Sequence, residues 1–307
     1  MAQAESGQSQ VILADEPYVI LDPRFAPFVV PGGRAERLWT GGTWAEGPAW
    51  FRAGWLLWSD IPGNRILRWD AATGAVTTFR HPSGGANGNT VDRHGRLVTC
   101  EGSTRRLTRT DAAGAVAVLA DRFDGLRFNA PNDVVEHSDG SLWFTDPSYG
   151  GPDYQGSREM GGCHVYRLDP ASGEIRQMTT DMVMPNGLAF SLDESALFVV
   201  DTGSTEGPDY PNHIRRFRVT PSGLTGGEVF ATSAAQRFDG IRFDSTGLLW
   251  CAEVDGVHCY APDGTLIGRI HLPERAANLT FGGLDGQTLF ITATTSLYRV
   301  PINARAP

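Results

Sequence analysis

The segment Asn186-Gly-Leu-Ala-Phe190 opens with an amide, passes through glycine and runs on as an apolar strand, and the chain contains six segments of this kind, each opening with a carboxylate or an amide. Successive copies begin 39 to 54 residues apart. Spacings of this size are typical of the four-stranded blades of a β-propeller. The six copies are Glu46-Gly-Pro-Ala-Trp50, Asn87-Gly-Asn-Thr-Val91, Asn132-Asp-Val-Val135, Asn186-Gly-Leu-Ala-Phe190, Asp239-Gly-Ile-Arg-Phe243 and Asn278-Leu-Thr-Phe281.

The copy that begins at Asn186 predicts one complete blade. Its four apolar or alternating runs are residues 187–190, 196–200, 213–219 and 227–231. The chain also contains 37 Gly, many of them in Asp-Gly turns, and no run with the periodicity of an ordinary helix. We therefore predict an all-β fold, a six-bladed β-propeller.

The last copy is one strand short, which indicates how the ring closes. It offers strands at 279–281, 288–291 and 296–300 before the chain ends. Because an open sheet edge exposes unpaired backbone groups, a fourth strand is needed, and Arg34–Thr40 is the candidate. This predicts residues 1–33 as an N-terminal arm and residues 34–307 as the propeller.

The overall composition of the chain argues against two classes of binding partner. The 307 residues carry 26 Lys and Arg against 35 Asp and Glu, a net charge of -9, which argues against binding to nucleic acid or an anionic membrane. No apolar run reaches the ~20 residues that cross a bilayer. The polar start, Met1–Gln10, does not resemble a signal peptide, so we expect a cytoplasmic protein, or a periplasmic one if a signal was removed. We expect a monomer or weak homodimer.

The four cysteines include no Cys-x-x-Cys pair, which makes a zinc-thiolate site unlikely. Cys251 and Cys259 flank a predicted hairpin turn and could face each other across it. Buried strand cysteines more often fill apolar space, and we expect all four to be reduced.

Oxygen-bearing residues fill the opening position of the repeat. In a propeller the first strand of each blade lines the central channel, so Glu46, Asn132, Asn186 and Asp239 should meet at one mouth. Two carboxylates and two amides suit Ca²⁺, and Mn²⁺ or Mg²⁺ is an alternative; the absence of His and Cys weighs against Zn²⁺ without excluding it. The competing interpretation is that Asn and Asp before Gly only cap turns. The second strands end in further acidic residues: Asp60, Glu101, Asp146, Asp201 and Glu253.

Four longer sequence blocks surround several of these positions: Ala86-Asn-Gly-Asn-Thr-Val-Asp-Arg-His-Gly-Arg-Leu-Val-Thr-Cys-Glu101, Asn132-Asp-Val-Val-Glu-His-Ser-Asp-Gly-Ser-Leu-Trp-Phe-Thr-Asp-Pro147, Met184-Pro-Asn-Gly-Leu-Ala-Phe-Ser191 and Phe238-Asp-Gly-Ile-Arg-Phe-Asp244. In these blocks the chain resembles the SMP-30/gluconolactonase family, six-bladed propellers that hold a divalent cation in the channel mouth. The resemblance covers about residues 35–302.

The resemblance implies roles for individual residues. Glu46, Asn186 and Asp239 would be direct ligands of the cation, and Asn132 a ligand directly or through water. Asp133 would lie beneath the ion, behind these ligands. The implied reaction is metal-dependent hydrolysis of a sugar lactone, such as glucono-1,5-lactone, to the open aldonic acid.

In that reaction the cation polarises the lactone carbonyl and water attacks its carbon. Asp239 is the first candidate for the general base, and the sequence leaves open whether it removes the proton or only holds the ion. No Gly-x-Ser-x-Gly motif indicates a serine hydrolase. Two alternatives are another lactonase, arylesterase or organophosphate hydrolase on this scaffold, and a non-catalytic calcium-binding propeller. Candidates for contacts with the sugar are Asn89, Glu101, Arg127, Tyr149 and Asp201.

Overall fold

A computed structural model describes residues 11–149, 159–220, 222–233 and 237–307. The chain forms two compact units. One comprises the segments Met1–Ser83 and Asp239–Pro307, and the other is Gly84–Phe238. Each unit contributes three antiparallel blades. The sequence prediction of an all-β, six-bladed β-propeller is confirmed.

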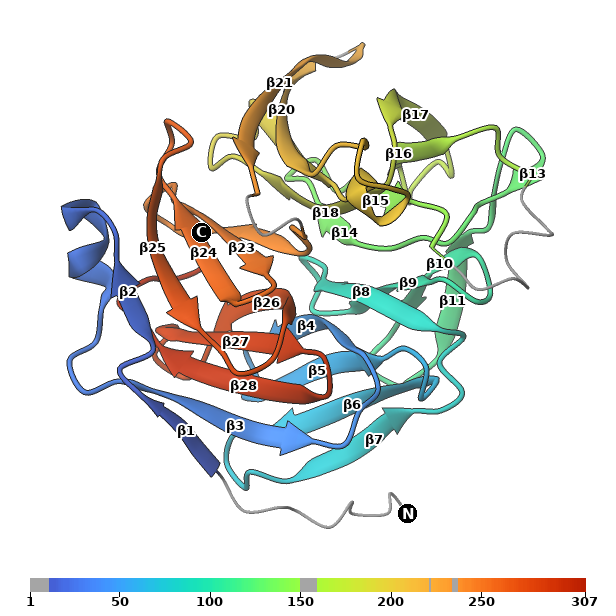
Figure 1. Cartoon of the computed structure of the whole chain (residues 1–307). Helices are drawn as coiled ribbons and strands as arrows, with labels where there is room; N and C mark the ends of the chain where they lie inside the picture. Colours follow the sequence, from blue (N-terminus) through green and yellow to red (C-terminus); the bar gives the residue numbers. More distant parts are fainter. Residues whose placement is uncertain (1–10, 150–158, 221, 234–236) are drawn as a thin grey trace. The chain divides into compact units, whose positions relative to one another are not determined.

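The first unit contains one four-stranded and two five-stranded blades (Figure 1). The four-stranded blade consists of β4 (Ala45–Phe51), β5 (Trp55–Asp60), β6 (Arg65–Asp70) and β7 (Val76–Arg80). The next consists of β22 (Ile241–Phe243), β23 (Leu249–Glu253), β24 (Gly256–Tyr260) and β25 (Leu266–His271), with β2 (Tyr18–Ile20) outside them. The last consists of β26 (Ala276–Gly282), β27 (Thr288–Ala293), β28 (Ser296–Pro301), β3 (Arg34–Thr40) and β1 (Val11–Asp15).

The strand β3 closes the last blade as the sequence predicts. It pairs antiparallel with β28, with Leu297 opposite Trp39, and Figure 1 shows the two side by side. A salt bridge of 2.6 Å between Arg299 Nη2 and Glu36 Oε2 crosses the same pair. The strand β1 then adds a fifth strand outside β3.

The second unit contains three four-stranded blades. They are β8 (Ala86–Val91), β9 (Leu97–Glu101), β10 (Arg106–Thr110) and β11 (Val116–Ala120); β14 (Val134–Glu136), β15 (Leu142–Asp146), β16 (Cys163–Leu168) and β17 (Ile175–Met182); and β18 (Pro185–Phe190), β19 (Ala196–Asp201), β20 (His213–Thr220) and β21 (Gly223–Thr232). A small hairpin, β12 (Arg122–Phe123) with β13 (Leu126–Arg127), precedes the middle blade. The four strands predicted for the Asn186 copy are confirmed.

Helical structure among the described residues is limited to two short 3₁₀ segments, η1 (Pro23–Phe28) and η2 (Gly203–Thr205). The described part of the chain contains no helix that is long and apolar enough to span a bilayer. All four cysteines are buried and free. Cys251 lies opposite His258 and Cys259 opposite Trp250 in the β23–β24 ladder, so the two thiols do not form the cross-turn pair that the sequence left open.

The segment between β2 and β3 is anchored in the core of the first unit. Phe25 of η1 is fully buried and packs against the ring of Trp250. A Cβ on Gly268 would lie 2.1 Å from Cγ of Phe25, so glycine makes room for this ring. The Tyr18 hydroxyl donates a hydrogen bond to the carbonyl oxygen of Pro301, and burial raises the pKa of Tyr18 to about 12.

Tyr18→Phe removes that hydrogen bond, and we expect the free energy of unfolding at pH 7 to fall by about 1 kcal/mol. The folded protein keeps the phenol neutral to a higher pH than the unfolded chain, in which a tyrosine ionises near pH 10. The wild-type advantage is therefore complete below pH 10 and shrinks between about pH 10 and pH 12. Urea denaturation at pH 7 and at about pH 12 measures this difference in the free energy of unfolding, with the exposed Tyr210→Phe as control. Equal stabilities of the wild type and Tyr18→Phe at pH 7 would show that the contact contributes nothing.

Candidate active site

The four residues predicted to bind a cation occupy the same register position in their blades. Glu46 lies opposite Ser59, the last but one residue of β5. The backbone N–H of Asn132 donates to the carbonyl of Thr145, and that of Asp239 to the carbonyl of Ala252, the last but one residues of β15 and β23. In the β18 blade the neighbouring Pro185 pairs with Asp201, the last residue of β19, which gives Asn186 the same position.

The sixth copy of the repeat is shifted by one residue relative to the sequence pattern. The backbone N–H of Gly240 donates to the carbonyl of Ala277, as the N–H of Gly88 donates to the carbonyl of Asn132. The residue of the last blade that corresponds to Asn132 is therefore Ala277. Asn278 corresponds instead to Asp133, because each of these side chains accepts a hydrogen bond from the next backbone N–H. Neither side chain is more than 2 % exposed.

In the first unit, two buried carboxylates lie at the same end of their strands. Glu46 is 4 % exposed and Asp239 is 5 % exposed. Oδ2 of Asp239 accepts a hydrogen bond from Nη2 of Arg275 at 3.2 Å, and the guanidinium of Arg275 stacks over the ring of Trp44, 5.0 Å from its centroid. Trp44 precedes Glu46 by two residues, so this chain of contacts links the two blade openings.

The loop that carries Arg275 is fixed to the turn between β27 and β28. Glu274 accepts hydrogen bonds from the backbone N–H of Thr295 at 2.8 Å and from the hydroxyls of Ser296 and Tyr298. Burial raises the pKa of Glu274, but these hydrogen bonds outweigh burial and leave the pKa below its ordinary value. The carbonyl of Arg275 itself accepts from the backbone N–H of Thr294. Arg275 was not predicted from the sequence, because nothing in the repeat marks a residue before an opening position.

In the second unit, two buried amides occupy the corresponding positions. Asn132 is 6 % exposed, and its side chain makes no hydrogen bond with any other described residue. Asn186 is 5 % exposed, and its Nδ2 donates to the hydroxyls of Tyr149 at 3.3 Å and Thr202 at 3.2 Å. Its carbonyl oxygen Oδ1 accepts no hydrogen bond from the described residues.

These donors fit a hard divalent cation. The amide oxygens of Asn132 and Asn186 receive no hydrogen bond from the described residues, so they are available to a ligand. Among the described residues no three His, Cys, Asp or Glu side chains cluster as a ligand set, so a cation site at these positions would depend on amide oxygens as well as carboxylates. Oxygen-only coordination of this kind is typical of Ca²⁺.

The acidic residues at the ends of the second strands have a common backbone partner. In three blades a carboxylate accepts hydrogen bonds from two successive backbone N–H groups just before the first strand: Asp60 from Thr43 and Trp44, Asp146 from Asn129 and Ala130, and Asp201 from Val183 and Met184. Each of these carboxylates is at most 1 % exposed. They hold the entry to the strands that carry the predicted ligands. A contact of Asp201 with substrate stays a prediction.

The other residues predicted to contact substrate already form hydrogen bonds within the protein. Glu101 accepts hydrogen bonds from Thr104, Arg106 and Thr108. Asn89 accepts from the hydroxyl of Thr99 at 2.8 Å and donates to the carbonyl of Asn87. Arg127 donates to the carbonyl of Thr104 at 2.7 Å. Only Tyr149 touches a predicted cation ligand in these contacts, and the role of all four toward substrate stays a prediction.

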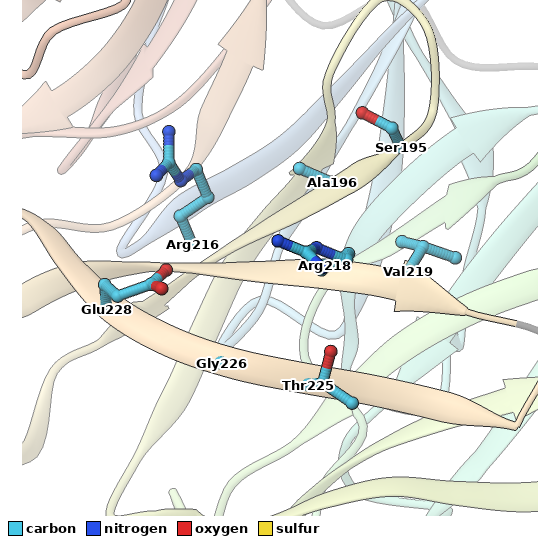
Figure 2. A pocket seen from close by; sticks show the side chains of 8 residues that line it. All are labelled: Ser195, Ala196, Arg216, Arg218, Val219, Thr225, Gly226 and Glu228. Atoms are coloured by element: carbon cyan, nitrogen blue, oxygen red, sulfur yellow. The ribbon is translucent and has the colours of Figure 1, made fainter.

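A separate hollow lies on the outer strands of the β18–β21 blade (Figure 2). Arg216 and Arg218 of β20 lie on the same face of that strand as each other, across from Thr225 and Glu228 of β21. None of the predicted site residues lines this hollow. It is therefore distinct from the positions at the blade openings.

Comparison with known proteins places this geometry in a family. The profile of the SMP-30/Gluconolactonase/LRE-like region matches residues 44–295. The chain is 33 % identical over 285 residues to a gluconolactonase of Zymomonas mobilis, covering 84 % of this chain and 78 % of that one. It is 31 % identical over 259 residues to a 6-deoxy-6-sulfogluconolactonase of Pseudomonas putida, covering 81 % and 82 %. The solved structure of a gluconolactonase of Xanthomonas campestris superposes with a TM-score of 0.89 at 35 % identity, covering 97 % and 99 %.

The chain therefore belongs to the SMP-30/gluconolactonase/LRE-like family of six-bladed propellers. It is a gluconolactonase-like enzyme of the lactone hydrolase class.

Proposed function

We propose that this enzyme hydrolyses sugar lactones, in the first place aldonolactones such as glucono-1,5-lactone, to the open aldonic acids. We further propose that Glu46, Asn132, Asn186 and Asp239 hold one divalent cation, Ca²⁺ in preference to Mn²⁺, Mg²⁺ or Zn²⁺. The observation that carries the proposal is that all four side chains occupy one register position of the blade repeat. Equivalent positions of propeller blades line one central channel.

The donor set supports both the charge and the type of ion. Two carboxylates supply the negative charge and two amides supply neutral oxygens, and the remaining positions would be filled by water and substrate. When bound, such a cation supplies Lewis-acid polarisation of the lactone carbonyl. The residues of the chain supply position, because Asp60 holds the loop before the strand of Glu46 and Arg275 donates a hydrogen bond to the carboxylate of Asp239.

Asp239 is the residue we propose to assist the attack of water on the carbonyl carbon. One of its oxygens, Oδ2, is oriented by Arg275, whose positive charge balances the buried carboxylate. A side chain held in one orientation is suited to accept a proton from a water at a fixed distance. Attack of water builds negative charge on the lactone carbonyl oxygen, so a cationic side chain beside this position also favours the transition state.

The choice of a sugar lactone rests on the relatives and on the polar surroundings. The relatives above are named for gluconolactone and a sulfonated gluconolactone. We propose that Tyr149 contacts the sugar, because its hydroxyl bonds to Asn186. Asn89, Glu101, Arg127 and Asp201 are further candidates, and each already holds a partner within the protein.

A substrate panel tests this proposal. We expect glucono-1,5-lactone and a pentonolactone to be hydrolysed far faster than homoserine lactones, phenyl acetate or paraoxon, as measured by acid release corrected for the spontaneous reaction. A preference for phenyl acetate or paraoxon would indicate an arylesterase or organophosphate hydrolase instead. Stoichiometric binding of Ca²⁺ without hydrolysis of any lactone would contradict the catalytic proposal and favour a binding propeller.

A further inference from the structure

A buried threonine contacts one residue of the proposed cation site, Asn186, and the residue that precedes another in the chain, Phe238. Thr202 directly follows β19 and is 1 % exposed. It precedes the 3₁₀ segment η2, yet its side chain makes no capping hydrogen bond to that segment. The hydroxyl instead contacts Asn186 and Phe238.

The two hydrogen bonds of this hydroxyl have a defined direction. Oγ1 of Thr202 donates to the carbonyl oxygen of Phe238 at 3.0 Å, because a carbonyl can only accept. The single hydroxyl proton is then used, so the contact of 3.2 Å with Asn186 requires Asn186 to donate. The amide nitrogen of Asn186 must therefore face Thr202, and Tyr149 accepts from the same nitrogen. The orientation of the Asn186 amide thus follows from the hydrogen-bond network.

This orientation decides which atom of Asn186 can serve a cation. With Nδ2 held by two hydroxyls, Oδ1 is the atom that is left for a ligand, and it accepts no hydrogen bond from the described residues. An amide rotated by 180° would present N–H groups, which repel a cation. The same threonine also holds the backbone of Phe238, the residue peptide-bonded to Asp239.

We propose that Thr202 is a positioning residue for cation binding, which fixes the amide of Asn186 with its oxygen available and anchors the backbone that leads into Asp239. This inference rests on the proposed function, because it assumes that Asn186 and Asp239 are ligands. Thr202 itself touches neither cation nor substrate. It would act on the site through the side chain of Asn186 and through the peptide bond between Phe238 and Asp239.

Thr202→Val tests the proposal, since valine keeps the shape and removes the hydroxyl. We expect the Kd for Ca²⁺, measured by titration calorimetry on the metal-stripped protein, to rise by about 10- to 100-fold, which is the usual cost of losing a hydrogen-bond partner behind a ligand. Thr202→Ser keeps the hydroxyl and should bind within about threefold of the wild type. Thr205→Val, which loses an exposed hydroxyl three residues away that bonds only to a backbone carbonyl, is the matched control and should bind as the wild type.

The outcomes separate this inference from the function on which it rests. Wild-type affinity in a folded Thr202→Val would overturn the positioning role and leave the cation site intact. Failure of the wild-type protein to bind Ca²⁺, Mn²⁺, Mg²⁺ or Zn²⁺ would overturn the cation site and the inference together. If Thr202→Val does not fold, Thr202→Ala removes the same hydroxyl, and an unchanged Kd there would overturn the proposal equally.

Discussion

Removal of divalent cations is expected to abolish lactone hydrolysis. The four proposed ligands, two carboxylates and two amides, are each 4 to 6 % exposed, and the amide oxygens receive no hydrogen bond from the described part of the protein. A cation held by these oxygens would polarise the lactone carbonyl, and its removal would take away that activation. After dialysis against EDTA, we expect activity to fall to the spontaneous rate and to return when Ca²⁺ is added in excess of the chelator.

Two controls make the chelation experiment decisive. Metal content by mass spectrometry must fall to zero in the inactive sample, and Na⁺ or K⁺ at the same ionic strength must not restore activity. The cation should also stabilise the folded protein, by RT ln(1 + [M]/Kd), so the melting temperature should rise with Ca²⁺ concentration. Full activity in a sample shown to contain no metal would end the cation hypothesis.

Much of the fold is predictable because each blade corresponds to one copy of the sequence repeat. The opening residue, glycine and apolar run recur at blade spacing, and closure follows from the missing fourth strand of the last copy. Arg34–Thr40 matches β3 residue for residue, since its place is fixed by the need to cover the edge of β28. The addition of β1 and β2 outside two blades could not be predicted, because short edge strands at the N-terminus lie outside the repeat.

The site is predictable at the positions that the repeat marks, and not at the residues that support them. Glu46 and Asp239 stand out because each opens a copy. Asn278 shows the limit of this reasoning. In the sequence pattern it opens the sixth copy, but in the structure its backbone register makes it the equivalent of Asp133. A bulge after the opening position permits this one-residue shift, and the sequence pattern carries no sign of it.

The residues that support the site could not be predicted from the sequence, because their partners are distant in the chain. Thr202 reaches Phe238, 36 residues away, and Arg275 reaches Asp239, also 36 residues away. The sequence shows that the second strands end in acidic residues, but not what these residues bind. In three of them the structure shows an additional task, because Asp60, Asp146 and Asp201 each hold the loop before a first strand. Such pairings depend on the register between neighbouring strands.

Replacement of the two carboxylates is expected to have the largest effect of any single substitution, and the pair can separate their roles. Glu46→Gln removes one charge from the proposed ligand set, so Ca²⁺ should bind more weakly, and much of the lost activity should return at high Ca²⁺ concentration. Asp239→Asn should lower kcat by on the order of 10²- to 10⁴-fold if Asp239 accepts the proton, and saturating Ca²⁺ should not restore it. Restoration of Asp239→Asn by Ca²⁺ would assign Asp239 to binding alone.

The Asp239 experiment needs a control for the arginine that it leaves behind. Arg275 is 19 % exposed and would lose its anionic partner, so Asp239→Asn is expected to be less stable than the wild type as well as less active. Asp70→Asn breaks an Arg–Asp pair of the same 3.2 Å length, with Arg68, at the far end of the blade from Glu46. We expect Asp70→Asn to retain wild-type kcat. Wild-type turnover in a folded Asp239→Asn, measured below its melting temperature, would remove Asp239 from the site. The reaction would then depend neither on the carboxylate of Asp239 nor on its ion pair with Arg275.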